Sequence, residues 1–484
     1  MTLTSTQMHE AEGLSNHFSR VPLGEIAEIV SGFGFPKELQ GKMEGDLPFF
    51  KVGDISKAWK QGQRLLTKAE HYISKTEAVQ IRAKSFPSGT LVFAKIGEAI
   101  KLNRRAILGQ PSIVDNNVMG LIPRQSLVDT LYLYYYMLTV KLGDISQATT
   151  VPSVRKSDVE DIGFPLLPIQ AQQAIVAEIE KQFSRLDEAV ANLRRVKANL
   201  KRYKAAVLKA AVEGKLTEDW RKQHPDVEPA SKLLERILTE RKAEWKGRGE
   251  YKEPAELETT NLPKIPKGWV WTTIAQIADV ASGNTPSGVL GAVKQTGDIP
   301  WFKVGDMNHD ENQQVMRHAE AWLSVAEVKG LGLRLFQPNT MLFPKRGGAI
   351  ATNKKRRLDS PGCADLNVMG ITPHHNIASY FFNWFGGVDL GQLSDGSNVP
   401  QINHKDIEPL AVPLPPLAEQ QAIIPEVECR LSIIEELDAV VEANITRADR
   451  LRQSILQQAF SGKLPMRGMP DVSRRAASIQ WSVQ

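Results

Sequence analysis

One phrase occurs twice in this chain, and the repetition constrains the fold more than any other feature. "FFKVGDIS" begins at Phe49, and "WFKVGDMN" begins at Trp301, 252 positions later. Other phrases recur at offsets of 251 to 248, among them "NVMGLIP" and "NVMGITP", and "GKL" at Gly214 and Gly462. This period is far beyond the roughly 20 to 50 residues of solenoid repeats, so the sequence predicts two folded domains with separate cores.

Each half has the same two-part organisation. It begins with short β-rich runs separated by Gly, Pro and Asn, such as "GTLVFAKIGEAI" and "NTMLFPKRGGAI", which predict a compact domain of mixed strands and helices. It then passes a proline-rich stretch, "FPLLPIQ" or "VPLPPLAEQ", and continues without further glycine to "GKL". The predicted fold class is therefore α+β, with two tandem-duplicated globular domains, each followed by a long helix.

Apolar residues recur at spacings of three and four along both predicted helices, which indicates a coiled-coil seam. The stripes also pass through Val196, Tyr203 and Val207 in the first helix, and through Leu437 and Ala448 in the second. The predicted seam residues are Ile179, Phe183, Leu186, Val190, Leu193, Leu200, Val427, Leu431, Ile434, Val441, Leu451 and Ile455. Some 40 residues give a rod of about 60 Å. Each stripe could instead be buried within its own half, but equal lengths at the same place in each repeat favour mutual packing.

These signals predict seven segments. They are an N-terminal arm (1–20), a first globular domain (21–168), a first helix (169–215), a linker (216–267), a second globular domain (268–416), a second helix (417–464) and a flexible tail (465–484). The linker is rich in Pro and charge, and one amphipathic helix is predicted in it around Ala230 to Trp245. Pro425 leaves two alternatives: the second helix starts near it, or the helix is kinked there.

No arrangement of catalytic residues or metal ligands is visible in the sequence. GxxxxGK[ST], GxGxxG, HExxH and the Asn-Pro-Pro-aromatic motif of adenine methylases are all absent. The two cysteines, Cys363 and Cys429, argue against a disulfide framework and against cysteine-bound metal. No apolar run approaches the roughly 20 residues that span a bilayer, and the first residues do not resemble a signal peptide. We therefore expect a cytoplasmic protein with no catalytic residue, no metal site and no membrane contact.

Positive charge recurs at matched places in the two halves, in "KIGEAIKLNRR" and "KRGGAIATNKKRR". Lys and Arg bind phosphates, while Arg and Asn can also contact base edges. The candidate DNA-binding residues are Lys95, Lys101, Asn103, Arg104, Arg105, Lys345, Arg346, Asn353, Lys354, Lys355, Arg356 and Arg357. The net charge of only +5 is weak support. A solvated charged loop is the alternative, and recurrence at one place in both copies favours DNA contact over it.

Taken together, these features resemble the specificity subunit of type I restriction-modification systems. The resemblance covers roughly Val21 to Leu464 and depends on the duplication and on four motifs: "PLPPLAEQQAI" at Pro413, "PLLPIQAQQAI" at Pro165, "AAVEGKLTEDWR" at Ala210 and "LPKIPKGW" at Leu262. Only the start of the first helix departs from the pattern, because it lacks an acidic counterpart of Glu419.

The resemblance implies that each globular copy is a target recognition domain that reads one half of a bipartite, asymmetric DNA site. The two helices would then form an antiparallel coiled coil, and "FKVGD" would belong to a framework that is used twice. It implies double-stranded DNA, two methylation subunits and restriction/translocase subunits as partners, with S-adenosylmethionine, ATP and Mg bound by those partners and no cofactor bound by this chain. A self-contained DNA-modifying enzyme and a coiled-coil scaffold without sequence reading are the alternative functions.

Overall fold

The chain folds into two compact units, of which the first is assembled from two separate parts of the sequence and the second from one continuous part. The computed structural model describes residues 19–147, 151–245, 250–255 and 257–464. Unit 1 comprises residues 1–194 and 442–484, and unit 2 comprises residues 195–441. The predicted tail and nearly all of the predicted N-terminal arm lie outside the described residues.

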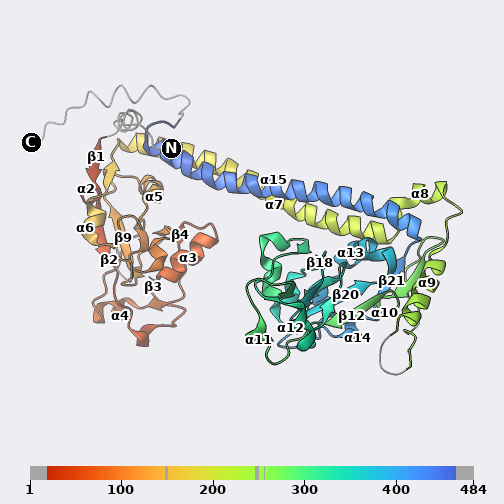
Figure 1. Ribbon diagram of the computed structural model, residues 1–484. Helices are drawn as coiled ribbons and strands as arrows, with labels where there is room; N and C mark the ends of the chain where they lie inside the picture. Colours follow the sequence, from red (N-terminus) through yellow and green to blue (C-terminus); the bar gives the residue numbers. More distant parts are fainter. Residues whose placement is uncertain (1–18, 148–150, 246–249, 256, 465–484) are drawn as a thin grey trace, which may run out of the picture. The chain divides into compact units, whose positions relative to one another are not determined.

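Unit 1 is built on a five-stranded sheet in the order β2-β9-β6-β7-β4 (Figure 1). Neighbouring strands are antiparallel except for β4 and β7, which are parallel. The strands are β2 (Ala27–Ser31), β9 (Val118–Pro123), β6 (Leu91–Ala94), β7 (Arg105–Leu108) and β4 (Leu65–Leu66). A three-stranded sheet and a strand pair complete the unit, formed by β5 (Tyr72–Ile73), β3 (Leu47–Phe50), β8 (Ile113–Val114), β1 (Arg20–Pro22) and β10 (Gly163–Pro165).

Unit 2 repeats this topology with one strand more. Its five-stranded sheet has the order β12-β20-β17-β18-β14, and its second sheet has one additional short strand, β16 (Leu335–Phe336). The strands of the large sheet are β12 (Ala278–Ser282), β20 (Val368–Pro373), β17 (Met341–Pro344), β18 (Arg356–Leu358) and β14 (Val315–Met316). The others are β15 (Trp322–Leu323), β13 (Ile299–Phe302), β19 (Gly362–Ala364), β11 (Val270–Thr273) and β21 (Ala411–Leu414).

Short helices connect these strands in both units. In unit 1 they are α2 (Leu23–Ile26), α3 (Val52–Lys60), α4 (Lys75–Gln80), α5 (Thr130–Thr139) and α6 (Lys156–Glu160). In unit 2 they are α10 (Ile274–Ile277), α11 (Val289–Ala292), α12 (Val325–Gly330), α13 (Ala378–Gly386) and α14 (His404–Ile407).

The repeated phrase "FKVGD" is a strand end joined to a capped helical turn. Its aspartate accepts a hydrogen bond from the backbone N–H of the lysine three residues earlier, at 2.7 Å for Asp54 and Lys51 and at 2.6 Å for Asp306 and Lys303. The preceding strands β3 and β13 bury their aromatic residues. The phrase recurs because one framework junction is used in both copies. After it the copies differ, since α3 is an α-helix whereas unit 2 has two 3₁₀ turns, η4 (Val304–Asn308) and η5 (Asp310–Asn312).

Two long helices of 44 residues each contribute to both units: α7 (Ile169–Val212) and α15 (Leu417–Phe460). In unit 1, Arg452 of α15 is paired with Asp187, and its guanidinium lies 5.1 Å from the ring centre of Phe183. In unit 2, Lys204 of α7 lies 3.5 Å from Glu435. Later in α7, Leu208 and Ala211 share a cluster with Ile423 and Val427, which precede Glu435 in α15, so the helix segments of unit 2 run antiparallel.

The seam between these helices is only partly buried. Ile179, Val190, Val427, Ile434 and Val441 are buried, as are Val207 and Ala448 of the wider stripes. Leu451 is 43% exposed, and Val196, Tyr203 and Leu437 are 44% to 48% exposed. Leu451 was a predicted seam residue, and its exposure corrects that assignment, whereas the other three positions belong only to the wider stripes. In a pair of helices, each helix has only one neighbour to cover its apolar face.

The ends of the long helices enter the cores of the globular parts. In unit 1, Phe460 near the end of α15 packs against Tyr132 and Tyr136 of α5, with ring centres 5.1 Å and 5.4 Å apart. In unit 2, Leu208 and Ala211 near the end of α7 share a buried cluster with Tyr380, Trp269, Ile423 and Val427. Each globular copy is therefore completed by the end of the other copy's helix.

The predicted linker is more structured than its composition indicated. The first long helix ends at Val212, and η3 (Lys215–Thr217) and α8 (Glu218–Gln223) follow it. The predicted amphipathic helix is α9 (Ala230–Ala243), which packs into the core of unit 2 through Leu233 and Ile237. The sequence predicted one helix here and missed α8.

The start of α15 resolves two features that the sequence left open. The helix begins at Leu417, so Pro425 lies inside it and does not mark its first turn. Glu419 is 1% exposed and forms an ion pair with Arg221 of α8. The same carboxylate accepts hydrogen bonds at 2.7 Å from Thr217 and from the indole N–H of Trp269. Glu419, the acidic residue of the proline-rich stretch "VPLPPLAEQ", therefore connects α8 and Trp269 to the start of α15.

None of the helices in the part of the chain that the structure describes is long and apolar enough to cross a membrane.

Candidate nucleic-acid interface

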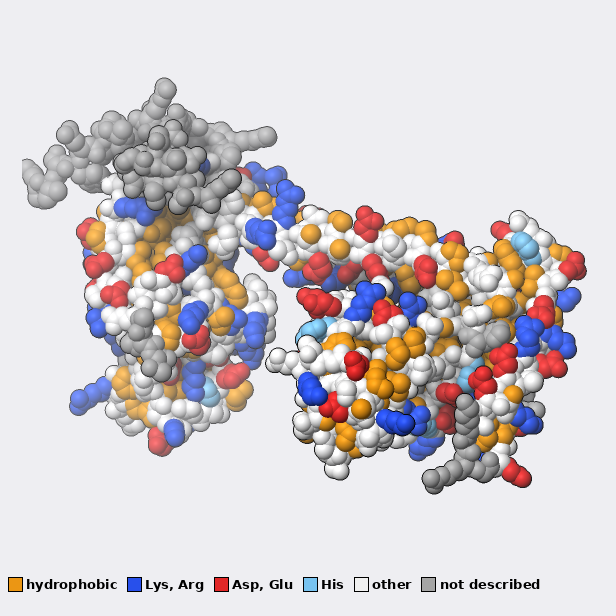
Figure 2. All heavy atoms as spheres, viewed as in Figure 1, with side chains coloured by type: hydrophobic (Ala, Val, Ile, Leu, Met, Phe, Trp, Pro, Cys, Tyr) orange, Lys and Arg blue, Asp and Glu red, His pale blue; other side chains and the backbone are white. Residues whose placement is uncertain are grey.

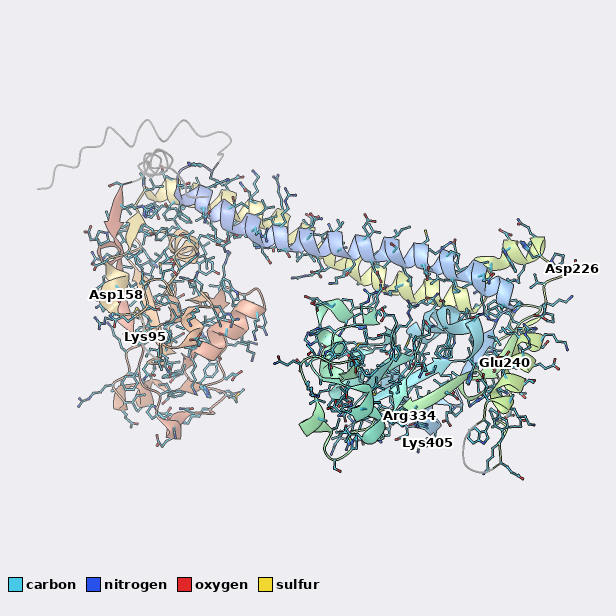
Figure 3. All side chains as sticks on the ribbon, in the orientation of Figure 1. Lys95, Asp158, Asp226, Glu240, Arg334 and Lys405 are labelled. Carbon is cyan, nitrogen blue, oxygen red and sulfur yellow. The ribbon has the colours of Figure 1, made fainter. Side chains whose placement is uncertain are left out.

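The two basic segments occupy equivalent connections in the two large sheets. In unit 1 the segment joins β6 to β7 through the short 3₁₀ turn η2 (Glu98–Ile100), and Figure 3 labels Lys95 at its start. In unit 2 it joins β17 to β18 through η6 (Gly348–Thr352). The two basic segments, which align in the sequence, therefore also occupy equivalent places in the folds of the two copies.

Backbone hydrogen bonds hold both segments in the same way. The N–H of Lys95 donates to Asn117 at 2.9 Å, and that of Lys345 donates to Asn367 at 2.9 Å. The carbonyls of the same two lysines accept from Val154 and Ile402, both at 2.9 Å. The start of each basic segment is fixed on both sides, so its lysine emerges from a rigid part of the sheet.

Glycine allows each segment to turn immediately after this point. Gly97 has φ of +82° and Gly347 has φ of +76°, a region that other residues rarely adopt. Their N–H groups donate to the carbonyls of Pro152 and Pro400 at 2.8 Å and 2.7 Å. Each basic segment is thus braced by a second loop that lies far away in the sequence.

The two matched asparagines have a structural role. Asn103 and Asn353 both have φ of +52°, and their side-chain oxygens accept backbone N–H groups of Leu142 at 3.3 Å and Leu390 at 3.0 Å. Asparagine tolerates the left-handed region better than most residues. Because their amide oxygens are already engaged, we withdraw these two residues as candidates for paired contacts to a base edge.

Arg105 is also removed from the interface, because its side chain is fully buried at 0% exposure. Its guanidinium donates to the carbonyls of Asn103 and Val140, both at 2.7 Å. Burial lowers the pKa of Arg105 from its ordinary value. The residue binds the chain's own backbone and has no surface with which to reach DNA.

Lys355 and Arg356 are engaged in a similar way in unit 2. The ammonium of Lys355 donates to Val388 at 2.6 Å and to Asn353 at 2.9 Å, and burial lowers its pKa to about 8. Arg356 is half-buried and donates to the carbonyl of Lys355 at 3.0 Å. These two side chains fix the start of β18, so they too are removed from the set that can reach a ligand.

Seven candidate side chains remain at least partly exposed. Lys101 is paired with Glu98 at 2.9 Å, Lys345 donates to Ser282 at 2.9 Å, and the guanidinium of Arg357 lies 5.5 Å from the ring centre of Phe382. The complete set is Lys95, Lys101, Arg104, Lys345, Arg346, Lys354 and Arg357. On the face drawn in Figure 2, basic and acidic side chains are mixed, so no purely basic surface marks the interface there.

The sequence interpretation missed the loops that brace the basic segments. "VPSV" at Val151 and "VPQI" at Val399 match at an offset of 248, and each valine is 55% exposed beside a basic segment. The matched Val-Pro pairs were the available signal. Each surface at a basic segment therefore combines charged and aliphatic side chains. Charged side chains suit contacts with phosphates, and aliphatic side chains suit contacts with base edges.

Comparison with protein families gives one matching model, described as the type I restriction modification DNA specificity domain. It matches residues 17–202 and again residues 266–428, so it covers both copies. This double match agrees with the duplication seen in the sequence and in the sheet topology.

Two curated relatives from Escherichia coli are similar over most of their length. The EcoDI type I restriction enzyme specificity subunit is 26% identical over 356 residues, which cover 70% of this chain and 71% of the relative. The EcoBI specificity subunit is 23% identical over 470 residues, which cover 93% and 87%.

Solved structures share the fold. The HsdS subunit from Thermoanaerobacter tengcongensis aligns with a TM-score of 0.52 and 17% identity, over 93% of this chain and 98% of that one. A chain from a study of assembly and conformational transition in a type I R-M system aligns with a TM-score of 0.63 and 16% identity, over 92% and 98%. The predicted α+β fold with two duplicated domains and paired long helices is confirmed.

Proposed function

Because the chain belongs to the type I restriction modification DNA specificity family, we propose that each globular copy reads one half of a bipartite, asymmetric DNA site. The chain is the DNA-recognition subunit of a restriction-modification complex and is not its catalytic component. Methylation or cleavage at the recognised site is directed by this chain and performed by partner subunits.

The duplication with divergence is the observation that carries this proposal. The two copies share strand order and the helical junction at "FKVGD", whereas the stretches that follow, Ile55–Lys68 and Met307–His318, have different sequences and different helical turns. One framework with two different surface segments suits a protein that reads two different half-sites. We assign the reading domains to residues 21–168 and 268–416.

The seven basic residues named above, all of them at least partly exposed, are the proposed DNA contacts. Each copy contributes some of them, at equivalent places on its large sheet. Contacts with phosphates weaken as salt rises, with a slope of about 0.9 per phosphate on logarithmic axes. Replacing Lys101 or Arg346 by Ala should therefore reduce the slope and weaken binding about equally on all sequences, because phosphate contacts carry no sequence information directly.

The proposed partners are double-stranded DNA, two methylation subunits and the restriction/translocase subunits. S-adenosylmethionine, ATP and Mg would be bound by those partners, and the complex would act in the cytoplasm, where the DNA is. The partly exposed apolar positions on α7 and α15 offer surface for such partners, since they are not covered within either unit.

A domain exchange tests the proposal in the assembled complex. Residues 21–168 would be replaced by the equivalent domain of a relative, and methylated DNA from cells with each version would be sequenced. We expect one half of the methylated motif to change and the other half to persist. A change in both halves would contradict modular reading, and methyl transfer by this chain alone would favour a self-contained enzyme.

A further inference from the structure

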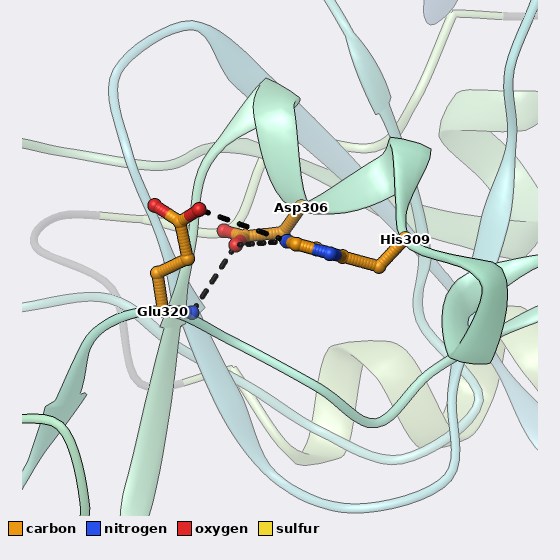
Figure 4. A group of neighbouring side chains, drawn as sticks. All are labelled: Asp306, His309 and Glu320. Atoms are coloured by element: carbon orange, nitrogen blue, oxygen red, sulfur yellow. Dashed lines mark hydrogen bonds and ion pairs between the residues drawn. The ribbon is translucent and has the colours of Figure 1, made fainter.

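Three potential metal ligands converge in unit 2, within and beside the stretch Met307–His318, whose sequence differs from that of unit 1 (Figure 4). Asp306 comes from η4, His309 follows that turn, and Glu320 lies two residues before β15. The Nε2 atom of His309 lies 3.8 Å from a carboxylate oxygen of Asp306 and 3.8 Å from one of Glu320. One ligand atom from each of the three residues lies within 4.8 Å of the others.

Unit 1 provides an internal comparison for this cluster. Asp54 and Glu70 are the counterparts of Asp306 and Glu320, at the same places beside "FKVGD" and "AE". The counterpart of His309 is Lys57, whose ammonium lies 2.9 Å from Glu70. In unit 1 a lysine therefore supplies positive charge beside the two carboxylates. In unit 2 the same position holds a residue that can act as a ligand.

The exchange of lysine for histidine changes the chemistry of the site. A lysine ammonium has only hydrogen-bond donors, so it can neutralise carboxylates but cannot bind a cation. A neutral imidazole offers a nitrogen lone pair and is the commonest metal ligand among side chains. One imidazole nitrogen with two carboxylates is a donor set that suits zinc and similar first-row ions better than magnesium, which prefers oxygen alone.

The geometry is partly organised for a cation. Asp306 is 2% exposed, and its two oxygens accept backbone N–H groups of Lys303 at 2.6 Å and Glu320 at 3.2 Å, so its carboxylate is held in place. The side chains of His309 and Glu320 are 34% and 66% exposed, which leaves them room to adjust. The imidazole is not hydrogen-bonded to either carboxylate at 3.8 Å. Four ligands around zinc at bonds of about 2.0 to 2.1 Å lie roughly 3.4 Å apart, so a small closure is sufficient.

We propose that Asp306, His309 and Glu320 form a divalent transition-metal site of the zinc class in the second copy. Among the described residues of the first copy, no such group of potential ligands comes together. The ring of His318 packs edge-on against His309, with ring centres 4.9 Å apart, and restricts the orientation of the imidazole. Water would complete the coordination. The cation would fasten the segment between η4 and β15, which carries the sequence that differs from unit 1.

Zinc titration of the full chain tests this site. The purified chain would be treated with a chelator and titrated with zinc chloride in a calorimeter, in parallel with His309→Lys and Glu320→Gln. His309→Lys copies the residue that unit 1 uses, so it should fold while it removes the imidazole ligand. We expect zinc to raise the unfolding temperature of the parent chain, and we expect at least a tenfold loss of affinity in both variants, since even outer-shell changes cost about 10- to 100-fold.

The matched control is His404→Lys, because His404 is also an exposed histidine near a carboxylate, at 3.2 Å from Glu408. This variant should bind zinc as the parent does. The site would be rejected if the parent chain binds no zinc, or if His309→Lys binds it as tightly as the parent. Equal affinity for magnesium and zinc would also reject it, because the imidazole would then contribute nothing to selectivity.

Discussion

At the scale of single residues, a run of positive charge in the sequence separates into residues with opposite roles. Arg104 and Arg105 are neighbours in "LNRR", yet only Arg105 is fully buried. Residue type and spacing correctly predicted where the basic segments lie in each copy. They could not predict which side chains turn inward, because that depends on backbone carbonyls such as Val140 that reach the segment only in the folded chain.

Replacing Arg105 by Ala should destabilise unit 1 by about 3 kcal/mol, because it leaves a cavity and two unpaired carbonyls. Hydrogen exchange measured by mass spectrometry should show faster exchange in peptides of β7 and α5. The exposed Lys101→Ala is the comparison and should change stability by less than about 0.5 kcal/mol. If the two variants are equally stable, the buried guanidinium is not a structural element.

At the scale of elements, the sequence predicted the long helices well and their surroundings less well. The glycine-free segments that follow the two proline-rich stretches form α7 and α15. Pro425 is the one residue in them that would be expected to interrupt a helix, and α15 continues through it. The short α8 was missed because six residues show too little periodicity to identify a helix. The candidate zinc ligands were missed for a related reason. Glu320 lies near Asp306 because the chain turns back into β15, and no short sequence spacing indicates that contact.

Two short helices in equivalent positions carry matched capping boxes, and these predict an acid-sensitive contribution to stability. Ser74 and Glu77 cap α4, and Ser324 and Glu327 cap α12. Hydrogen bonds lower the pKa of both glutamates to about 2; the largest contribution comes from Lys42 for Glu77 and from the backbone N–H of Ser324 for Glu327. The unfolded chain therefore binds more protons than the folded chain between pH 4.5 and about 2, and this contribution is complete above that window and lost as pH falls through it.

A variant with both Glu77→Gln and Glu327→Gln should show a shallower fall of stability between pH 4.5 and 2 than the parent chain. Urea unfolding at a series of pH values measures this slope. Glu38→Gln, an exposed residue in the short turn Lys37–Leu39, is the matched control and should leave the slope as in the parent. An unchanged slope in the double variant would show that the boxes do not contribute.

At the scale of the whole molecule, the sequence predicted the duplication but did not predict which residues make up each compact unit. The repeat places the second helix with the second copy, whereas residues 442–460 of that helix belong to unit 1. Phe460 and Leu456 join the core cluster that contains Tyr132 and Phe164. A local pattern shows that a helix has an apolar face, but the partner of that face is chosen by the fold of the entire chain.

Ending the chain after Val441 should therefore damage the first copy rather than the second. The deletion exposes Tyr132 and Phe164 by removing Phe460, so peptides of α5 and β10 should lose protection from hydrogen exchange. Peptides of β17 and β20 should keep theirs, because unit 2 ends at Val441. Loss of protection in the second copy alone would contradict this assignment.

The paired helices also predict a spacing function for the complex. Both helices contribute to both units, so inserting four residues after Leu193 and four after Val441 preserves their pairing while adding about 6 Å and a rotation of about 40° to each. DNA advances roughly 34 Å per turn, so the spacing of the reading domains must match the spacing of the grooves. We therefore expect the reading domains of the insertion variant to bind half-sites at a different separation.

Sequencing of methylated DNA from cells with the insertion variant should reveal the same two half-sites with a longer nonspecific gap. Inserting four residues into the exposed linker after Lys252 is the control and should leave the gap as it was. An active insertion variant with the original gap would mean that the helices do not set the spacing.

The dependence of unit 1 on Phe460 also bears on the order in which the protein is made. A ribosome synthesises the chain from its first residue, and domains generally fold as their residues emerge. Every residue of unit 2 has been made by Val441, while unit 1 still lacks the segment that covers Tyr132. The first copy to be translated is therefore the last that can finish folding, and its uncovered aromatic surface must be kept from aggregation until the segment that contains Phe460 has been made.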